Sequence, residues 1–121
     1  MSNKPIAIKR IYEDPANNDG YRVLVDRIWP RGVSKEEAGL DDWVKEIAPT
    51  DELRKWFDHD PDKFDKFKKR YKKELEAHED TLKELAEKST KKKLTLLYGA
   101  KDEKHNQAVV LKEVLENKRQ S

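Results

Sequence analysis

The chain has no cysteine, which excludes disulfides, thiolate catalysis and cysteine-ligated zinc sites. Long apolar runs are also missing, and none approaches the ~20 residues that a membrane-spanning helix requires. The first five residues, Met1 to Pro5, lack the apolar segment of a signal peptide. We therefore expect a soluble cytoplasmic protein that makes no contact with a membrane.

A strong net charge is absent as well, because 27 Lys and Arg residues nearly balance 25 Asp and Glu residues, leaving +2. Such a small excess predicts neither strong attraction nor strong repulsion toward nucleic acid. The charges are unevenly spread along the chain. Residues 41–62 hold eight acids and three bases (−5), whereas residues 63–93 hold twelve bases and seven acids (+5). A surface with two poles of charge is compatible with this distribution.

What the chain does have is enough bulk for a modest core. Its 121 residues predict one domain over 1–121, with frayed ends at 1–4 and 118–121. Only 35% of the residues are hydrophobic and 43% are charged, so most charged side chains must cover a solvated surface. Three Trp, four Tyr and three Phe add bulk to the core, and a disordered chain would rarely carry so many aromatic residues.

Short apolar runs predict the strands of this domain. The segments 6–11, 21–28 and 93–98 are rich in aliphatic and β-branched residues. Because the last two are nearly continuous apolar runs, we expect them to be buried on both faces, as in a parallel sheet. Segment 43–47 predicts a further strand, with three alternate residues on one face: Trp43, Lys45 and Ile47.

Capping signals place helices between these strands. Ser34 and Glu37 have the spacing of a capping box, and the short helix behind them should stop at Gly39. Strands that alternate with helices predict an α/β fold, here a single three-layer domain with a small, mainly parallel sheet flanked by helices. Further helices are predicted at 51–57 behind the N-cap Thr50, at 61–88 as one helix or as two with a break near His78, and at 103–117.

Polar side chains follow the two most apolar strands at the points where those strands end. Asp26 and Arg27 come after the first run, and Lys101 and Asp102 come after the second. Parallel α/β folds bind ligands just beyond the carboxyl ends of their strands, and right-handed crossovers would bring these two ends to one edge. The sequence therefore predicts one site in which the pair Asp26-Arg27 faces the pair Lys101-Asp102.

The first cluster offers one acceptor and two cations. Asp26 is a candidate hydrogen-bond acceptor or general base, and Arg27 is a candidate clamp for a carboxylate or phosphate, because its planar fork matches those groups. The alternative is an internal salt bridge that fixes the loop. Trp29 could stack on a planar ligand, although a plug for the core beneath the loop is the favoured interpretation. Arg31 is a ligand candidate because nothing nearby in the sequence needs its charge.

The second cluster adds a cation and a histidine. Lys101 would join the two arginines in a cationic pocket, and Asn106 could orient a ligand there. His105 follows Asp102 by three residues, so the two could act as a general base and its orienter, or the histidine could be structural. The alternative is a capped turn in which Asp102 or Asn106 binds the backbone. The chain has no His-x₃-His or carboxylate-rich ligand spacing, so neither a metal nor a cofactor is expected.

The most basic run of the chain lies at 68–73 and offers a rival class of function. It could follow the phosphates of nucleic acid, with Tyr71 available to stack on a base. Tyr71 also belongs to the apolar stripe of its helix, so a solvated helix face is the favoured interpretation. The rival hypothesis is a non-catalytic module that binds nucleic acid or protein through the basic helix 63–73. No feature of the sequence sets an oligomeric state.

With these residues assembled, the chain resembles the family of domains of unknown function number 488 (DUF488), in its YeaO-like subgroup. This resemblance implies an α/β protein from bacteria or archaea whose reaction is unassigned. In the wider family, cysteine often stands where this chain has Tyr98 and again close to His105, so no thiol- or metal-based role carries over. The segments that carry the resemblance are 23–32, 43–49, 53–57, 59–61, 95–102 and 105–106.

These observations lead to one hypothesis about function. A cytoplasmic protein would bind a small ligand bearing a phosphate or a carboxylate at the carboxyl edge of its sheet. The cationic side chains would hold the ligand, while Asp26, His105 and Asn106 would orient it or exchange protons with it. Any enzymatic activity would be acid–base or hydrolytic chemistry that needs neither metal nor thiol.

Overall fold

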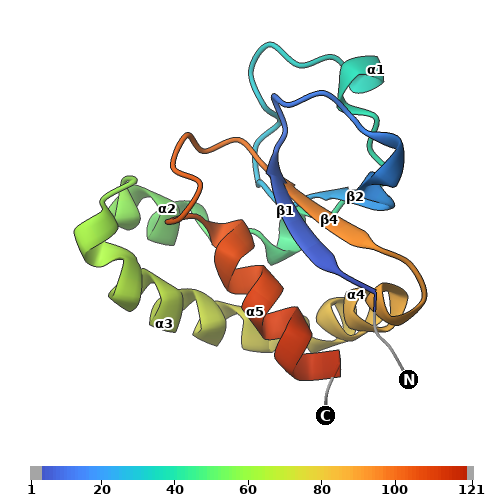
Figure 1. Ribbon diagram of the computed structural model, residues 1–121. Coiled ribbons are helices and arrows are strands. Elements are labelled where there is room, and N and C mark those ends of the chain that lie inside the picture. Colours follow the sequence, from blue (N-terminus) through green and yellow to red (C-terminus); the bar gives the residue numbers. More distant parts are fainter. Residues whose placement is uncertain (1–3, 120–121) are drawn as a thin grey trace.

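A computed structural model describes residues 4–119 of the chain. Its four strands form one sheet in the order β1-β4-β2-β3, and every pairing in this sheet is parallel (Figure 1). The predicted α/β class with a parallel sheet is therefore confirmed. The strands are β1 (Ile6–Arg10), β2 (Tyr21–Leu24), β3 (Asp42–Trp43) and β4 (Leu94–Tyr98).

Strand β4 is central, and all five of its residues are buried. Alternate side chains of β2 and β4 point to opposite faces of the sheet, so each face carries apolar groups. Leu94 and Leu96 join the larger core on one face, whereas Leu97 joins a smaller cluster on the other. This double burial is why the strand has no polar alternation in its sequence.

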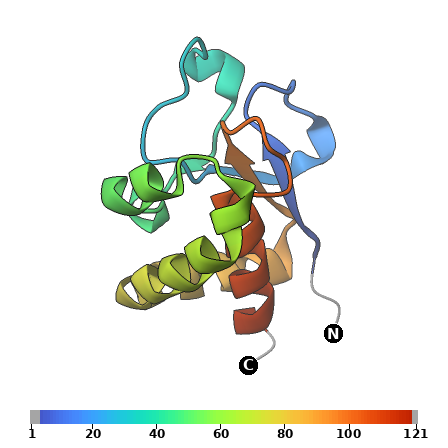
Figure 2. The same cartoon turned by 90° about the vertical axis from the view of Figure 1, so that its left-hand side faces the viewer.

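One face of the sheet is covered by helices, and the other by loops and one short helix. Figures 1 and 2 show α5 between the strands and α3, with α2 and α4 at the two ends of this helical layer. The opposite face carries α1 (Lys35–Ala38), whose Ala38 packs against Leu24 and Leu97. The helices of the larger layer are α2 (Asp51–Phe57), α3 (Phe64–Leu75), α4 (Glu79–Lys91) and α5 (Gln107–Arg119).

A buried ion pair fastens the loop layer to the sheet. The Arg22 guanidinium, on β2, lies 2.5 Å from the Asp19 carboxylate and also donates to the carbonyls of Ala38 and Gly39. Lys9, on β1, lies 3.2 Å from the same carboxylate. Burial would raise the pKa of Asp19, but hydrogen bonds from the Ala16 N–H, Lys9 and Arg22 outweigh it, so this pKa lies below its ordinary value.

The predicted caps are confirmed in atomic detail. Ser34 Oγ accepts from the Glu37 N–H at 3.1 Å, and a Glu37 carboxylate oxygen accepts from the Ser34 N–H at 3.1 Å. Gly39 ends α1 with a φ of 54°, in the left-handed region that glycine adopts at little cost. Thr50 Oγ1 accepts from the Leu53 N–H and thereby caps α2.

Two strand predictions were too long. Strand β2 ends at Leu24 rather than near Ile28. Beyond it the Val25 N–H still donates to the Leu97 carbonyl, but the Asp26 carbonyl accepts from the side-chain indole N–H of Trp43. The predicted strand 43–47 was wrong beyond Trp43, since Lys45–Ile47 form a turn of 3₁₀ helix. That turn sends Ile47 into the larger core, while Trp43 packs in the smaller one.

Helix boundaries also differ from the predicted ones. The segment 61–88 forms two helices, because a 3₁₀ turn at Glu76–His78 separates α3 from α4, as one of the two alternatives predicted. The helix predicted at 103–117 begins only at Gln107, since the residues before it form a turn. The chain was predicted to fray at 1–4 and 118–121, and of these residues 1–3 and 120–121 lie outside the described range. Among the others, the Lys4 N–H donates to the Ser89 carbonyl, and α5 extends to Arg119.

Candidate functional site

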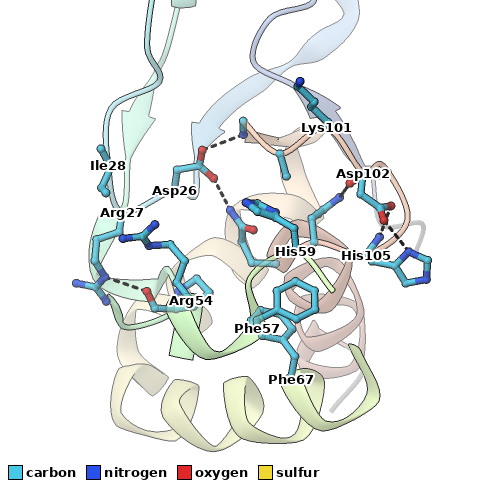
Figure 3. A pocket seen from close by; sticks show the side chains of 15 residues that line it. Asp26, Arg27, Ile28, Arg54, Phe57, His59, Phe67, Lys101, Asp102 and His105 are labelled. Atoms are coloured by element: carbon cyan, nitrogen blue, oxygen red, sulfur yellow. Dashed lines mark hydrogen bonds and ion pairs between the residues drawn. The ribbon is translucent and has the colours of Figure 1, made fainter. Parts of the chain in front are cut away.

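A pocket of about 590 Å³ opens at the carboxyl ends of β2 and β4, where the sequence predicts a site (Figure 3). Four segments build it. The first follows β2, the second runs from Pro49 through α2 to the turn behind it, the third is α3 with Phe67, and the fourth is the loop between β4 and α5 with the first residue of α5. The lining residues are Asp26, Arg27, Ile28, Pro49, Arg54, Phe57, His59, Phe67, Gly99, Ala100, Lys101, Asp102, His105, Asn106 and Gln107.

Asp26 lies at the base of the pocket and binds neutral donors. Its Oδ2 accepts from the Gly99 N–H at 2.8 Å, and its Oδ1 accepts from the Gln107 side-chain amide. Burial raises the pKa of Asp26 from its ordinary value of 3.8 to about 6, against the opposing effect of these hydrogen bonds and of the charges of Arg54 and His59. A carboxyl group with such a pKa changes its charge within the physiological range.

The backbone comes very close to Asp26 at Gly99. A Cβ placed on this glycine would lie 2.9 Å from the Asp26 Oδ2 atom, which is closer than real Cβ contacts allow. Arg10 holds the same loop from the other side, because its Nε donates to the Ala100 carbonyl at 2.9 Å. Glycine at this position therefore permits the hydrogen bond that joins the end of β2 to the end of β4.

Arg27 lines the pocket, but its guanidinium is turned toward the backbone of the neighbouring segment (Figure 3). Its Nε donates to the Pro49 carbonyl at 2.9 Å, and its Nη2 donates to the Ala48 carbonyl at 3.0 Å. These bonds tie the end of β2 to the chain just before α2. Much of the hydrogen-bonding capacity of Arg27 is thus already used within the protein.

Two pocket residues with nitrogen-bearing side chains were not among the site residues predicted from the sequence. Figure 3 shows the Arg54 guanidinium and the His59 ring directed toward the space in front of Asp26. Arg54 projects from α2, and its Nη2 is 3.3 Å from the exposed Asp51 carboxylate. His59 follows the C-cap of α2 and has a φ of 55°, which is uncommon for a residue other than glycine. The only signal for both residues was their place in segments 53–57 and 59–61 of the family resemblance.

The predicted neighbours Asp102 and His105 are in contact. The Asp102 Oδ2 atom lies 2.9 Å from the His105 Nδ1 atom, while its Oδ1 accepts from the backbone N–H groups of Lys104 and His105. The hydrogen bond from Lys104 contributes most to lowering the pKa of Asp102. Asn106 is buried; its Oδ1 accepts from the Val109 N–H, and its Nδ2 donates to the Asp102 carbonyl. These are the contacts of the capped turn that the sequence left as an alternative.

The remaining candidates lie at the rim or outside the pocket. Lys101 is an exposed rim residue whose ammonium points away from Asp26 (Figure 3). Trp29 lies outside the lining and packs edge-on against Trp43, with its indole N–H donating to the Val33 carbonyl at 2.7 Å. Arg31 is exposed and also lies outside the lining. The structure therefore brings Asp26, Arg27, Lys101, Asp102, His105 and Asn106 to one pocket and leaves Trp29 and Arg31 outside it.

Within residues 4–119, no three His, Asp or Glu side chains are grouped as metal ligands would be. Over the same range, none of the helices combines the length and the apolar character needed to cross a membrane.

The fold and the pocket define a small α/β protein with a polar site at the carboxyl edge of a parallel sheet. The chain belongs to the DUF488 family, because residues 5–121 match the family model described as "Inactive DUF488-N3 subclade". The predicted resemblance is thereby confirmed, including its YeaO-like character.

Two relatives illustrate this membership. The chain is 47% identical over 106 residues to the uncharacterized protein YeaO of Escherichia coli strain K12, a match that covers 88% of the chain and 92% of that protein. It is 49% identical over 70 residues to the uncharacterized protein Rv3073c of Mycobacterium tuberculosis strain H37Rv, covering 58% of the chain and 59% of that protein. No solved structure matches the chain.

Proposed function

We propose that this cytoplasmic protein binds a small ligand bearing a phosphate or a carboxylate in the pocket at the carboxyl edge of the sheet. The observation that carries the proposal is the direction of two side chains, since Arg54 and His59 both face the space above Asp26. Arg54 is exposed, and its partner Asp51 is exposed too, so their ion pair is weak and an incoming anion can replace it.

The walls of the pocket indicate what the rest of the ligand is like. Phe57, Phe67, Pro49 and Ala100 present apolar surface beside the charged groups. Ligand pockets commonly combine such walls with a few polar groups that fix orientation. The proposed ligand therefore has an apolar or planar body and one anionic group, and an arylphosphate is a suitable model for it.

Asp26 makes the proposed binding sensitive to pH. An ionised carboxylate at the base of the pocket repels an anion, whereas a neutral carboxyl group does not. Since burial raises the pKa of Asp26 to about 6, anion affinity is expected to rise as the pH falls through that value.

Binding without turnover is favoured over the acid–base or hydrolytic chemistry that the sequence left open. The family model that matches the chain is described as an inactive subclade. In addition, both carboxylate oxygens of Asp26 already accept hydrogen bonds from Gly99 and Gln107, which suits a positioned group more than a free base.

Calorimetric titration with sodium sulfate and with phenyl phosphate tests this proposal. We expect Arg54→Ala to weaken binding of both anions about tenfold, because a hydrogen bond to a charged group contributes about 1.5–3 kcal/mol. Lys55→Ala is the matched control, since Lys55 is the next residue of α2, is exposed and lies outside the pocket lining. Phenyl phosphate should bind more tightly than sulfate if the apolar walls take part.

Two results of these titrations would contradict the proposal. Equal losses in Arg54→Ala and Lys55→Ala would place the anion outside the pocket and overturn the proposal. Failure of the parent protein to bind either anion would also overturn it. Sulfate is the probe for the pH series because it stays doubly charged near neutral pH, so a change in affinity near pH 6 reports on the protein.

A further inference from the structure

The outer face of α3 carries a row of cations that the pocket does not use. Lys66, Lys69, Arg70 and Lys73 are spaced by three, one and three residues, which places them on one side of the helix. All four are exposed. Figures 1 and 2 show α3 at the outside of the helical layer, with α5 between it and strands β1 and β4. We call these four residues the α3 stripe.

Other lysines of α3 serve a different purpose. Lys68 and Lys72 each lie 3.1 Å from the Glu113 carboxylate of α5, so their charges are used in holding the two helices together. Among the residues that the structure describes, no carboxylate forms an ion pair with a member of the α3 stripe. Asp65 lies four residues before Lys69 and Glu74 lies four residues after Arg70, but the Glu74 carboxylate accepts hydrogen bonds from the Thr50 N–H and hydroxyl.

An aromatic ring holds one member of the stripe in place. The Arg70 guanidinium carbon lies 4.2 Å from the centre of the Trp56 ring, and Trp56 is fixed in turn by Lys63, whose Nζ donates to its carbonyl at 3.0 Å. This cation–π contact restrains Arg70 near the ring, and its guanidinium has several N–H donors with which it can bind a phosphate.

We propose that the α3 stripe binds the phosphate backbone of a nucleic acid without reading its sequence. From Lys66 to Lys73 the helix advances about 10 Å at 1.5 Å per residue. Phosphates of one duplex strand advance about 3.4 Å each along the axis, so the stripe spans about three such steps, which corresponds to about four phosphates. Its side chains are all lysine or arginine, which commonly bind phosphate oxygens, and such contacts carry no sequence information.

The same composition argues against a protein partner. Stable protein interfaces have an apolar, desolvated centre, whereas no aliphatic side chain lies within the α3 stripe. The stripe also shares no residue with the pocket, so the two sites can succeed or fail independently.

Fluorescence anisotropy with a labelled DNA duplex of arbitrary sequence tests the proposal on the full chain. Binding should weaken with salt, with a slope of log affinity against log salt of about −3 to −4 for roughly four phosphate contacts. Combined substitution Lys66→Ala, Lys69→Ala and Lys73→Ala should reduce affinity about tenfold or more. The control Lys35→Ala, Lys83→Ala and Lys91→Ala removes the same charge from exposed positions elsewhere and should cause a much smaller loss.

A second variant keeps the test independent of net charge. Trp56→Leu preserves every cation but removes the ring beneath Arg70, so it should cause a partial loss of affinity. Equal losses in the two triple variants would show that only overall charge matters and would overturn the proposal. Tight binding of poly-glutamate at the same stripe would overturn it in favour of an acidic protein partner. Thermal melts verify that each variant is folded.

Discussion

Two aspartates flank strand β2, and the protein treats them in opposite ways. Asp19 lies just before β2 and is buried against Arg22 and Lys9, which are both charged. Asp26 lies just after β2 and binds only neutral donors, the Gly99 N–H and the Gln107 amide. The pKa of Asp19 is lowered, whereas burial raises the pKa of Asp26 to about 6.

Asp19 is therefore a structural carboxylate, whereas Asp26 lies in a site that is open to a ligand. At the amino end of β2 the charge of Asp19 is compensated from within, and the ion pair joins the loop layer to the sheet. At the carboxyl end, the cation that faces Asp26 across open space is Arg54, which is exposed and held only by a surface ion pair. A ligand can therefore complete the second site but not the first.

The largest expected effect comes from removing the cation that compensates Asp19 at the amino end of β2. Arg22→Leu would leave the Asp19 carboxylate buried with Lys9 as its remaining cation, and it would also leave the Ala38 and Gly39 carbonyls without a donor from Arg22. Removing one partner of a buried pair costs about 3–5 kcal/mol. We expect a loss of that size in the free energy of unfolding, measured by urea denaturation.

The matched change at the other site is Arg54→Leu, which removes the α2 cation that faces Asp26 beyond the carboxyl end of β2. Because the ion pair of Arg54 is exposed, its removal should change the free energy of unfolding by about 0.5 kcal/mol or less. Comparable losses in the two leucine variants would contradict the distinction between the two ends.

A smaller effect, with a defined pH dependence, is expected at Asp26. Below pH 3.8 the carboxyl group is protonated in both the folded and the unfolded chain, but between that value and about 6 only the folded chain keeps the proton. Stability of the parent protein should therefore fall as the pH rises through this window, by about 3 kcal/mol at most. Asp26→Asn cannot ionise, so its stability relative to the parent should rise over the same window.

Urea denaturation of the parent and Asp26→Asn at pH values below and above the window measures this difference. The asparagine variant loses one acceptor facing Gly99 or Gln107, which lowers its stability by a similar amount at every pH. Only the pH-dependent part of the difference reports on the raised pKa. Parallel stability curves for the two proteins would show that ionised Asp26 is not penalised by burial.

The same comparison explains how much of the molecule the sequence could predict. The parallel sheet followed from apolar runs that must be buried on both faces, and the caps at Ser34 and Thr50 followed from local hydrogen-bonding rules. Both depend on interactions that are encoded within a few residues. The short length of β3 did not follow, because it depends on Ile47 turning beneath α3, where its carbonyl accepts from the Tyr71 hydroxyl.

The site was predictable in location more than in composition. Strand ends placed Asp26, Lys101 and Asp102 at one edge, as the topology of a parallel sheet requires. The direction of a side chain is set by long-range contacts, so the sequence could not show that Arg27 turns toward Ala48 and Pro49. Arg54 and His59 were missed for the same reason, since a helix and a left-handed turn carry them to the pocket from a distant segment.

Apart from the Arg54→Leu comparison, the smallest expected effect concerns the contact between the ends of β2 and β4. Gly99→Ala would place a Cβ 2.9 Å from the Asp26 Oδ2 atom, so the carboxylate must move and its hydrogen bond to the Gly99 N–H must lengthen. We expect a loss of about 1–2 kcal/mol in the free energy of unfolding. In the double variant with Asp26→Asn the two losses should not add, because both act on one contact. Simple additivity in urea denaturation would mean that Gly99 is required for a reason other than its contact with Asp26.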